Sequence, residues 1–439
     1  MRIGRTLPPA ATPITITAIL SGVRGLFRGS DETGRFRAEL IEHFGMKHCF
    51  LVSSGKTALA LTLLALKELH PERDEVVIPA FTCYSVPASI LKAGLRIRLC
   101  DLAKDTLDFD FAKLANILTA ATAECVSSDG DRGTAPRSVA PGNQALTNVT
   151  PSRVLAVIPT HLFGFPADVA RLRSLILDPE ISIIEDAAQA MGESSGARKL
   201  GTIGDVGIYS LARGKAFTTV EGGVILTNRV DIATILNRNL GKLPEYGFSA
   251  QTALLVKALV MMVMLKPWFF WIPRSLPFLK LGVTVFEPDF ANQSMSPFQA
   301  GLSVNWRDRL DMMRQARVKL AEQWATILEG MCVEPISFRH LQLPGLIRFP
   351  VRIPNQAQRK LLLDTSEREG VGIMPVYPQA ISELQELGYS AKAGEFANAE
   401  RYARELVTLP THGYLKSTDL VAIRRILAHT LKACRSGAK

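Results

Sequence analysis

A polar turn between a predicted strand and a predicted helix is the first place in the chain that could bind a ligand. Residues 49–59 read CFLVSSGKTAL, so an apolar strand ends at two serines and Gly55, and a helix begins near Lys56. The free N–H groups and the positive dipole end of such a helix favour phosphate. The GKT triplet suggests a nucleotide P-loop, but that loop needs a glycine where this chain has Phe50. The pattern therefore favours a phosphate site of another kind.

A second candidate is the carboxylate pair that ends another apolar strand. Residues 181–192 read ISIIEDAAQAMG, with Glu185 and Asp186 at the strand end. A carboxylate in a buried position must be paired or functional, because unpaired burial of a charge costs several kcal/mol. The structural alternative is that Asp186 caps the following helix.

A third candidate is a lysine in the turn after a further strand. Residues 210–223 read SLARGKAFTTVEGG, in which Ser210 ends one strand, Lys215 lies in the turn, and a glycine pair opens the next strand. A single lysine in a loop is usually solvated. Lys215 therefore gains meaning only together with the other two sites.

The elements that must position these residues alternate along the chain. Amphipathic helical stretches at 57–68, 86–93 and 167–177 separate short apolar runs, and strands joined through helices are typical of a mostly parallel sheet that is covered on both faces. Ligands of such sheets bind at the carboxyl ends of the strands, where all three candidates lie. The predicted strands are 49–53, 75–80, 96–101, 154–159, 181–185, 206–210 and 223–227.

Taken together, these motifs resemble the DegT/StrS family of pyridoxal phosphate (PLP) sugar aminotransferases. The resemblance rests on SSGxTAL, PAFT, HLFGFPAD, IIEDAAQAMG, GDVGIYSLARGK and EGG, and it resumes with MSPFQAGL at 295–302 and FANAERYARELVTLPTH at 396–412. It covers nearly the whole chain apart from two unusual segments. It implies an α/β fold of PLP fold type I, with a mostly parallel seven-stranded sheet in a large domain and a smaller C-terminal α+β domain.

The resemblance also implies a role for each candidate site residue. Lys215 would hold the PLP aldehyde covalently and later move the proton of the donor's α-carbon. Asp186 would bond the pyridine nitrogen and keep it protonated, so that the ring can accept electrons. Gln189 would bond the 3-oxygen of the ring. The phosphate would be held by Gly55, Lys56, Thr57 and Ser210, with Asn292 reaching it from the neighbouring subunit.

Several positions depart from the family pattern. Cys83 stands where the family has an aromatic residue that stacks on the PLP ring, so either its thiol or Tyr84 would face the cofactor. Lys56 replaces the usual threonine and adds a cation for the phosphate. Ser294 replaces the arginine of the N-x-R-M motif, and residues 286–290 (FEPDF) replace a stretch that contains histidine. The contacts to a sugar nucleotide therefore cannot be carried over to this chain.

From the resemblance we expect an aminotransferase that moves an amino group from an amino acid, glutamate first, to a keto or aldehyde sugar or a related acceptor. We also expect a homodimer with shared active sites. The dehydratase branch of the family has histidine at the lysine position, which Lys215 argues against. A different alternative is a catalytically degenerate PLP-binding protein that acts as a membrane-associated partner in a polysaccharide or lipid pathway.

Composition narrows the classes of protein further. The chain has 439 residues, of which 47% are hydrophobic and 21% charged, which argues against a disordered chain or a multispan membrane protein. The net charge of +10 suits a phosphorylated substrate or an anionic membrane, and we expect no nucleic-acid partner. The N-terminus has no continuous apolar run of a secretory signal. We expect a cytoplasmic enzyme without a metal, because no CxxC pair occurs among Cys49, Cys83, Cys100, Cys125, Cys332 and Cys434.

One unusual segment, residues 253–282, is strongly hydrophobic and aromatic. Its uncharged run at 258–265 has eight residues, fewer than the about 20 that a membrane span needs, and prolines divide the rest. Trp268, Phe269 and Trp271 lie among lysines and arginines, which suits the headgroup boundary of a membrane. The alternative is a helical hairpin packed on the protein itself or on its dimer partner.

The domain layout follows from these segments. We expect an N-terminal arm at 1–30, a large PLP-binding domain at 31–252, a hydrophobic insertion at 253–290 and a small C-terminal domain at 291–439. Residues 119–153 lack any period and predict a loop inserted in the large domain. We also expect one long helix at 298–328.

Overall fold

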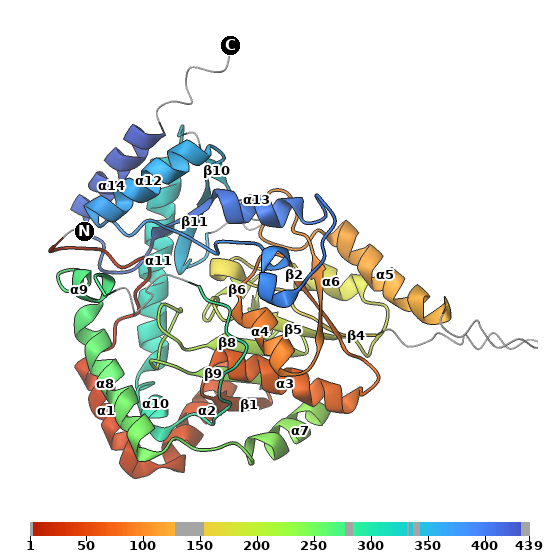
Figure 1. Ribbon diagram of the computed structural model, residues 1–439. Coiled ribbons are helices and arrows are strands. Elements are labelled where there is room, and N and C mark those ends of the chain that lie inside the picture. Colours follow the sequence, from red (N-terminus) through yellow and green to blue (C-terminus); the bar gives the residue numbers. More distant parts are fainter. Residues whose placement is uncertain (1–2, 128–152, 277–283, 332, 337–342, 432–439) are drawn as a thin grey trace, which may run out of the picture.

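A seven-stranded sheet forms the centre of the larger domain. The computed structural model describes residues 3–127, 153–276, 284–331, 333–336 and 343–431 (Figure 1). The strand order is β1-β9-β8-β5-β4-β2-β3. Strands β8, β5, β4, β2 and β3 are parallel, and β9 is antiparallel to both of its neighbours. The strands are β1 (His48–Val52), β2 (Glu75–Pro79), β3 (Arg96–Cys100), β4 (Val154–Val157), β5 (Ser182–Asp186), β8 (Val206–Ser210) and β9 (Gly223–Thr227). The expected mostly parallel sheet is confirmed, with strand bounds within two residues of the prediction.

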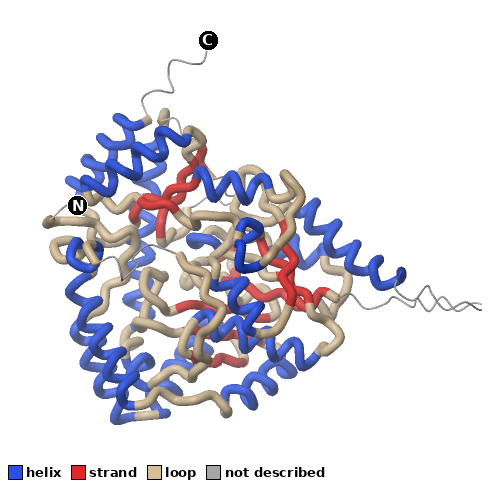
Figure 2. The backbone as a smooth tube through the Cα atoms, in the orientation of Figure 1, coloured by secondary structure: helices blue, strands red, loops and turns tan. Residues whose placement is uncertain are grey.

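Helices cover both faces of this sheet, and Figure 2 shows the strands inside a shell of helices. Val76 and Ile78 of β2 belong to one apolar cluster, and Val77 between them belongs to another. Burial on both faces explains why these strands read as continuous apolar runs. The first cluster includes α3 (Gly55–Leu69), α4 (Ser85–Lys92) and α7 (Val230–Leu240), and the second includes α5 (Phe111–Ser127) and α6 (Val169–Leu175).

The small domain is built on a second, four-stranded sheet of order β10-β11-β13-β12. Its strands are β10 (Glu334–Pro335), β11 (Arg348–Arg352), β12 (Met374–Pro375) and β13 (Leu406–Pro410). Its helices are α12 (Gln356–Glu369), α13 (Ala397–Glu405) and α14 (Ser417–Thr430), with short 3-10 turns η3 (Ile381–Glu383) and η4 (Gln385–Leu387). The larger domain adds the turn η1 (Leu162–Gly164) and a hairpin of β6 (Ser194–Ser195) and β7 (Arg198–Lys199).

The long helix expected at 298–328 is wrong. The chain forms α10 (Pro297–Gly301) and then α11 (Trp306–Leu328), separated by a break at Asn305. Asn305 has φ 51°, a left-handed conformation that asparagine tolerates better than most residues and that ends an α-helix. The two helices can therefore pack in different directions.

The N-terminal helices and the hydrophobic segment lie together at one edge of the molecule. This edge contains α1 (Ile16–Arg28), α8 (Phe248–Met264) and α9 (Trp271–Arg274), and α2 (Ser30–Phe44) continues from α1 toward β1 (Figure 1). The predicted division of the segment is confirmed, since α8 ends before Pro267; residues 277–283 lie outside the described part. Among the described residues, no helix has the length and apolar character needed to cross a bilayer.

The expected loop insertion at 119–153 begins as a helix. α5 continues to Ser127, because Ala115, Leu118 and the alanines that follow sustain the helix beyond the predicted boundary. Residues 128–152 lie outside the described part. The domain boundaries stay predictions.

Candidate active site

The phosphate-binding turn predicted at Ser54–Thr57 is the N-terminus of α3. The Ser54 side chain caps this helix by accepting a hydrogen bond from the Thr57 N–H at 3.1 Å. Among the described residues, the N–H groups of Gly55 and Lys56 have no acceptor, as is usual in a first helical turn. A Cβ atom on Gly55 would lie 2.9 Å from Ser210 Cβ, so only glycine lets the helix approach the end of β8 this closely. The structure thus brings Gly55 and Ser210 together as predicted.

The chain segment that carries Asn292 runs past the same turn. The Ser53 N–H donates to the Gln293 carbonyl at 2.9 Å, and the Thr57 hydroxyl donates to the Ala291 carbonyl at 3.4 Å. The Asn292 Oδ1 atom is buried and has no hydrogen-bond partner among the described residues. Asn292 therefore lies by the helix terminus of its own chain. Its expected action on a neighbouring subunit stays a prediction.

Lys56 points toward the segment that replaces the family's histidine stretch. Its ammonium lies 3.3 Å from a Glu287 carboxylate oxygen and 4.7 Å from the centroid of the Phe290 ring. Lys92 on α4 contacts the same segment, with its ammonium 3.2 Å from Asp289. Two lysines therefore hold residues 287–290 over the start of α3.

Asp186 is the buried carboxylate at the end of β5. One of its oxygens accepts the Ala188 N–H at 3.1 Å, and the other accepts no hydrogen bond from the described residues. Burial raises the pKa of Asp186, while the positive charge of Lys215 and the Ala188 N–H oppose the rise. The bond to Ala188 is the local turn that the capping interpretation expects, but it uses only one oxygen. The second oxygen can bind a cationic N–H group of a ligand.

The Lys215 loop is held from outside by two other parts of the chain. The Thr12 hydroxyl, from the N-terminal arm, donates to the Lys215 carbonyl at 2.5 Å. The guanidinium of Arg317, on α11, donates to the Ala216 carbonyl at 2.9 Å and to the Lys215 carbonyl at 3.4 Å. Burial lowers the pKa of Arg317 to about 10, so this guanidinium is still charged at neutral pH. These contacts fix the backbone of Lys215 and leave its amine for chemistry.

Gln189 joins the two domains beside Asp186. Its Oε1 accepts the Phe163 N–H at 3.0 Å, and its Nε2 donates to the Tyr377 hydroxyl at 3.2 Å. Phe163 has φ 60°, a strained value for a bulky residue, and its carbonyl accepts the N–H of Ile347 at 3.0 Å. The Gln189 amide thus supports a strained residue that also anchors the start of β11.

The structure distinguishes Cys83 from Tyr84 as the residue that faces the candidate site. The Tyr84 hydroxyl both donates to the Gln379 carbonyl and accepts from the Gln379 N–H, each at 3.0 Å. The Cys83 thiol accepts a hydrogen bond from Ser85 at 3.0 Å and lies near Arg348 and Tyr377. Of the two alternatives, the arrangement favours the thiol as the group on the side of the site.

Arg348 is a site residue that sequence reasoning missed. It begins β11, and its guanidinium carbon lies 5.8 Å from the centroid of the Phe163 ring. Its Nε atom is buried without a hydrogen-bond partner among the described residues. Burial lowers the pKa of Arg348, but a guanidinium stays charged at neutral pH. This cation can bind a carboxylate. An arginine at a strand start reads as a surface residue, and nothing local in the sequence identifies it.

A buried pair supports the strand end behind Asp186. His161 Nε2 lies 2.9 Å from Glu185 Oε2, and both side chains are fully buried. His161 Nδ1 accepts the Ala167 N–H, so the proton lies on Nε2 and is donated to Glu185. Burial tends to raise the pKa of Glu185, but the His161 bond and the N–H groups of Gly201 and Gly204 outweigh it and lower the pKa. The backbone N–H of His161 donates to the backbone carbonyl of Asp186 at 3.0 Å.

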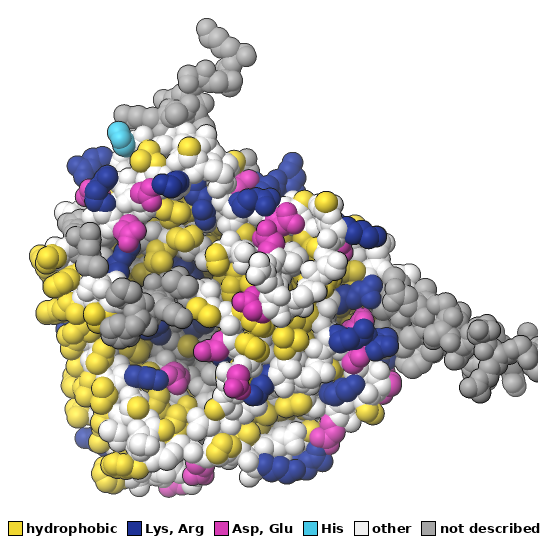
Figure 3. Space-filling view, in the orientation of Figure 1, with side chains coloured by type: hydrophobic (Ala, Val, Ile, Leu, Met, Phe, Trp, Pro, Cys, Tyr) yellow, Lys and Arg dark blue, Asp and Glu magenta, His cyan; other side chains and the backbone are white. Residues whose placement is uncertain are grey.

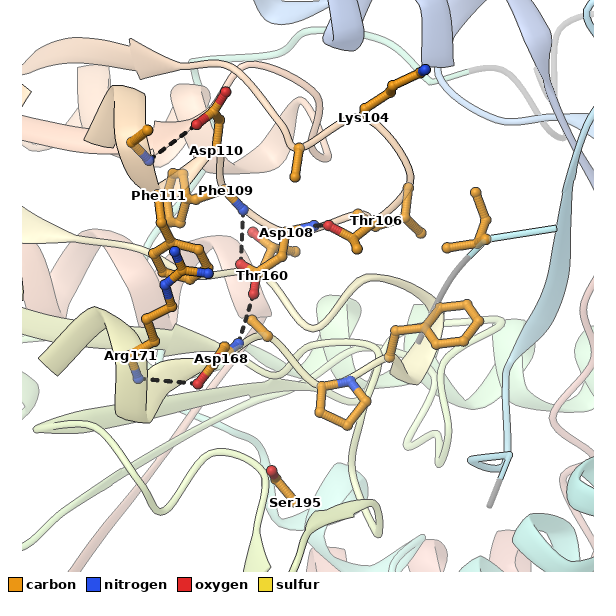
Figure 4. Close-up of a pocket in the computed structure, with 17 residues that line it drawn as sticks. Lys104, Thr106, Asp108, Phe109, Asp110, Phe111, Thr160, Asp168, Arg171 and Ser195 are labelled. Carbon is orange, nitrogen blue, oxygen red and sulfur yellow. Dashed lines mark hydrogen bonds between the residues drawn. The ribbon is translucent and has the colours of Figure 1, made fainter. Parts of the chain in front are cut away.

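A separate cavity of about 430 Å³ is lined by Thr160, whose backbone pairs with Asp186, and by Asp108 and Asp168 (Figure 4). Its carboxylates are engaged in local backbone bonds. Asp108 accepts the N–H groups of Phe109 and Asp168, at 2.8 and 2.7 Å, and Asp168 accepts that of Arg171 at 3.0 Å. Burial raises the pKa of Asp108. These residues cap turns, and they assign no chemistry to the cavity.

The residues of the candidate site offer three kinds of complementary group. The start of α3 with Ser210 suits a phosphate, the Asp186 carboxylate suits a cationic N–H, and Arg348 suits a carboxylate. Lys215 supplies an amine near Asp186, since its positive charge lowers the pKa of that carboxyl.

Comparison with known proteins identifies relatives of the chain. Residues 17–427 match the model of the DegT/DnrJ/EryC1/StrS aminotransferase family. GDP-perosamine synthase of Caulobacter vibrioides is 30% identical over 204 residues, which cover 46% of each protein. GDP-4-keto-6-deoxy-D-mannose 3-dehydratase of Yersinia pseudotuberculosis is 26% identical over 48% of this chain and 47% of that protein. The chain thus spans about half the length of these two curated relatives.

Solved structures show the same fold. A putative sugar aminotransferase of Streptococcus pneumoniae superposes with a TM-score of 0.71 over 97% of this chain and 99% of that protein, at 18% identity. At this identity the likeness concerns the fold, which is that of PLP fold type I enzymes.

Proposed function

The chain belongs to the DegT/DnrJ/EryC1/StrS aminotransferase family, and from this premise we propose that it is a PLP-dependent aminotransferase. It would move an amino group from an amino acid, glutamate first, to a keto or aldehyde sugar or a related acceptor. The observation that carries the proposal is the placement of Asp186, buried and with one free oxygen, within the field of the Lys215 charge.

The residues of the site fit PLP at each of its ends. The N–H groups of Gly55 and Lys56 and the Ser210 hydroxyl would hold the phosphate. Asn292 has an unpartnered buried amide oxygen beside this turn, and rotation of the amide by 180° would place its Nδ2 donor there. Asp186 would bind the pyridine N–H, and Gln189 would lie near the ring oxygen. The Glu287 carboxylate near this turn is paired with the Lys56 ammonium.

When bound, PLP supplies an electron sink and a carrier for the amino group. Asp186 would keep the pyridine nitrogen protonated, since its burial favours sharing a proton over standing alone as an anion. The Lys215 amine would take the proton from the donor's α-carbon. In the second half of the reaction it would donate a proton to the acceptor carbon that receives the amino group. Thr12 and Arg317 would orient Lys215 through its backbone carbonyl. The donor leaves as a 2-oxo acid, and the acceptor carbonyl becomes an amine.

Arg348 supports an amino acid as the donor. Its buried, unpartnered Nε faces the side of the site that Cys83, Phe163 and Tyr377 line. A guanidinium in this state binds a carboxylate with charge-assisted hydrogen bonds. The donor's carboxylate is the group in the reaction that matches it.

The dehydratase branch of the family differs from this chain at the position of Lys215. By resemblance, the dehydratase branch has histidine where aminotransferases have the lysine, and this chain has Lys215. A lysine at this position supports amino transfer.

A homodimer is part of the proposal. Asn292 and its neighbours run along the outer edge of β1, where Val52 pairs with Ser294, so this segment lies at an exposed margin of the large sheet. Sedimentation velocity of the PLP-loaded protein tests the dimer. A monomer that retains PLP fully at working concentration would contradict it.

The proposal is tested by separating the two halves of the reaction. The PLP-loaded protein is mixed with L-glutamate, with L-glutamine and alanine as alternative donors, and the 2-oxo acid is measured in a single turnover. The aminated form is then offered nucleotide-linked keto sugars, free keto sugars and aldehydes. One equivalent of 2-oxo acid per active site is expected, and it should be absent with Lys215→Ala. Bound PLP with no turnover for any donor would favour a catalytically degenerate partner protein instead.

A further inference from the structure

Two stretches of the sequence contain no acidic residue at all. Residues 1–30 and 247–286 have neither aspartate nor glutamate, although the chain has 41 of these residues in total. The same stretches contain several lysines and arginines. An absence of carboxylates in two separate segments becomes meaningful if the fold places the segments side by side.

The fold does place them side by side. Ile14, Ala18 and Ile19 at α1 share an apolar cluster with Leu254 and Ala258 of α8. The Thr6 N–H donates to the Pro267 carbonyl at 2.7 Å, which ties the N-terminal arm to the turn after α8. The two segments therefore form one surface, here called the α1–α8–α9 face.

α1 packs closely on the rest of the protein. α1 crosses α10 at two glycines, where a Cβ on Gly22 would lie 2.8 Å from the Phe298 ring and one on Gly25 would overlap the Pro297 carbonyl. The inner side of α1 is therefore packed closely on α10. Its outer side lies beside α8.

The outer sides of these helices expose large apolar side chains. Phe27 is 88% exposed and Trp268 is 62% exposed. Figure 3 shows hydrophobic side chains gathered along the margin where Figure 1 places α1 and α8. More than half of the exposed large hydrophobic side chains in the described part of the chain lie here: Ile16, Leu20, Leu26, Phe27, Phe248, Val256, Leu259, Val260, Trp268, Phe269 and Leu276.

α8 shows most directly that this surface is apolar and exposed within the single chain. Leu254, Ala258 and Leu265 form its buried side, and Val256, Leu259 and Val260 form an exposed side at helical spacing. A helix that is apolar all round is ordinarily buried in a protein core or in lipid. Half of α8 satisfies this rule against the protein, and the outer half faces outward.

The charges on this face indicate what covers it. Arg24 and Lys266 are exposed and form no ion pair among the described residues. The ion pairs of Arg28 with Glu32 and Lys257 with Glu221 use carboxylates from outside the two acid-free segments. In a symmetric contact with a second copy, neither acid-free segment could offer a carboxylate to Arg24 or Lys266. An anionic bilayer offers both an apolar layer and negative headgroups.

We propose that the α1–α8–α9 face docks this protein on the surface of an anionic lipid bilayer. The aromatic side chains insert at the headgroup boundary, and Arg24 and Lys266 lie among the lipid phosphates. The proposed contact is peripheral, at the bilayer surface. The inference does not depend on the proposed reaction.

Vesicle flotation of the PLP-loaded wild type tests the proposal. We expect the protein to float with vesicles that contain phosphatidylglycerol, to bind pure phosphatidylcholine weakly, and to be released in part by salt. Lipids that carry a quencher near the headgroup should quench the fluorescence of Trp268 in the wild type. This quenched signal should be absent in Trp268→Leu. The other described tryptophans, Trp271, Trp306 and Trp324, are half-buried or buried, which makes the signal specific.

Two variants and a matched control separate the causes. The first variant combines Phe27→Ser, Trp268→Ser and Phe269→Ser. It should bind vesicles roughly tenfold more weakly or worse, because three apolar anchors are lost. Arg24→Gln with Lys266→Gln should weaken it roughly fivefold per cation and reduce its dependence on salt. The control is Leu177→Ser with Val230→Ser, which removes exposed apolar side chains elsewhere and should bind as wild type does.

Three outcomes would overturn the proposal. The first is that wild type does not bind phosphatidylglycerol vesicles, and the second is that the aromatic variant binds them as tightly as wild type. The third is that the aromatic variant converts a dimer to a monomer while no variant differs in vesicle binding, which would assign the face to a second copy. Thermal unfolding of each variant is measured alongside to show that the fold is retained.

Discussion

The active site and the α1–α8–α9 face treat charge in different ways. In the candidate site, Asp186 lies near Lys215, Glu185 accepts a hydrogen bond from His161, and Arg317 donates to two carbonyls. Arg348 is an exception, since its Nε atom has no hydrogen-bond partner among the described residues. On the face, exposed cations lie among apolar side chains, and neither segment supplies a carboxylate. The first pattern suits a small ligand with several distinct ends. The second suits an extended surface that is apolar and negative.

The N-terminal arm connects the two regions physically. Thr6 bonds to Pro267 at the face, Pro8 accepts a hydrogen bond from buried His412, and Thr12 bonds to the carbonyl of Lys215. The two regions can nevertheless be tested apart, because their side chains do not overlap. Variants in the site should change turnover and leave vesicle binding as it is.

The largest effect is expected for Lys215→Ala. The variant should lose the borohydride-reducible link to PLP and nearly all amino transfer, because Lys215 is the amine whose charge acts on Asp186. Turnover with glutamate and mass spectrometry after borohydride reduction measure this. Vesicle binding should equal that of wild type. Substantial remaining amino transfer would remove Lys215 from the mechanism.

Asp186→Asn should follow, with a rate lower by about two to four orders of magnitude. The amide keeps the shape and can still accept the Ala188 N–H, but it no longer holds a proton on the pyridine nitrogen. PLP should stay bound, as seen from its absorbance. Unchanged kinetics would mean that Asp186 only caps the turn and has no catalytic role.

Arg348→Gln should raise KM for the amino-acid donor roughly 10- to 100-fold, the range of a charge-assisted hydrogen bond. KM for the acceptor should change little. Arg359→Gln is the matched control, since Arg359 also has a buried, unpartnered Nε but lies on α12. A rise in both donor and acceptor KM, or an equal effect of the control, would contradict a carboxylate contact at Arg348.

The site was predictable from the sequence where a motif falls at a strand end. Asp186 and Ser210 follow apolar strands, and a parallel sheet collects such ends at one edge. Arg348 was not predictable, because only the packing of the small domain brings β11 onto Phe163. The break between α10 and α11 was missed because residues 302–305 contain no glycine or proline, and Asn305 alone is a weak signal.

The face was the least predictable part. α8 is apolar on both sides, so its periodicity cannot tell which side is buried. The contact with α1, which joins residues more than two hundred positions apart, decides that question. The sequence alone therefore left both packing and membrane contact open for residues 253–282.

The smallest effect concerns the arm that links the two regions, through His412. His412 is buried, its Nδ1 accepts the Tyr414 N–H, and its Nε2 donates to the Pro8 carbonyl at 2.7 Å. Burial lowers the pKa of His412 to about 4 from its ordinary value of 6.5. Between these two values the unfolded chain binds a proton that the folded chain does not, so the free energy of unfolding falls as the pH falls through this window.

The expected loss from His412 is about 1.4 kcal/mol per pH unit at most, or about 3 kcal/mol in total between pH 6.5 and pH 4. His412→Asn can keep an acceptor for the Tyr414 N–H but cannot be protonated, so its stability should depend less on pH in this window. Urea unfolding at several pH values compares the two proteins, and the difference between them isolates His412 from other titrating groups. Parallel pH profiles for wild type and His412→Asn would mean that His412 takes up its proton in the folded state as easily as in the unfolded chain. The arm would then not be held at Pro8 by a neutral imidazole, and its other contacts, such as those of Thr6 and Thr12, would link the two regions.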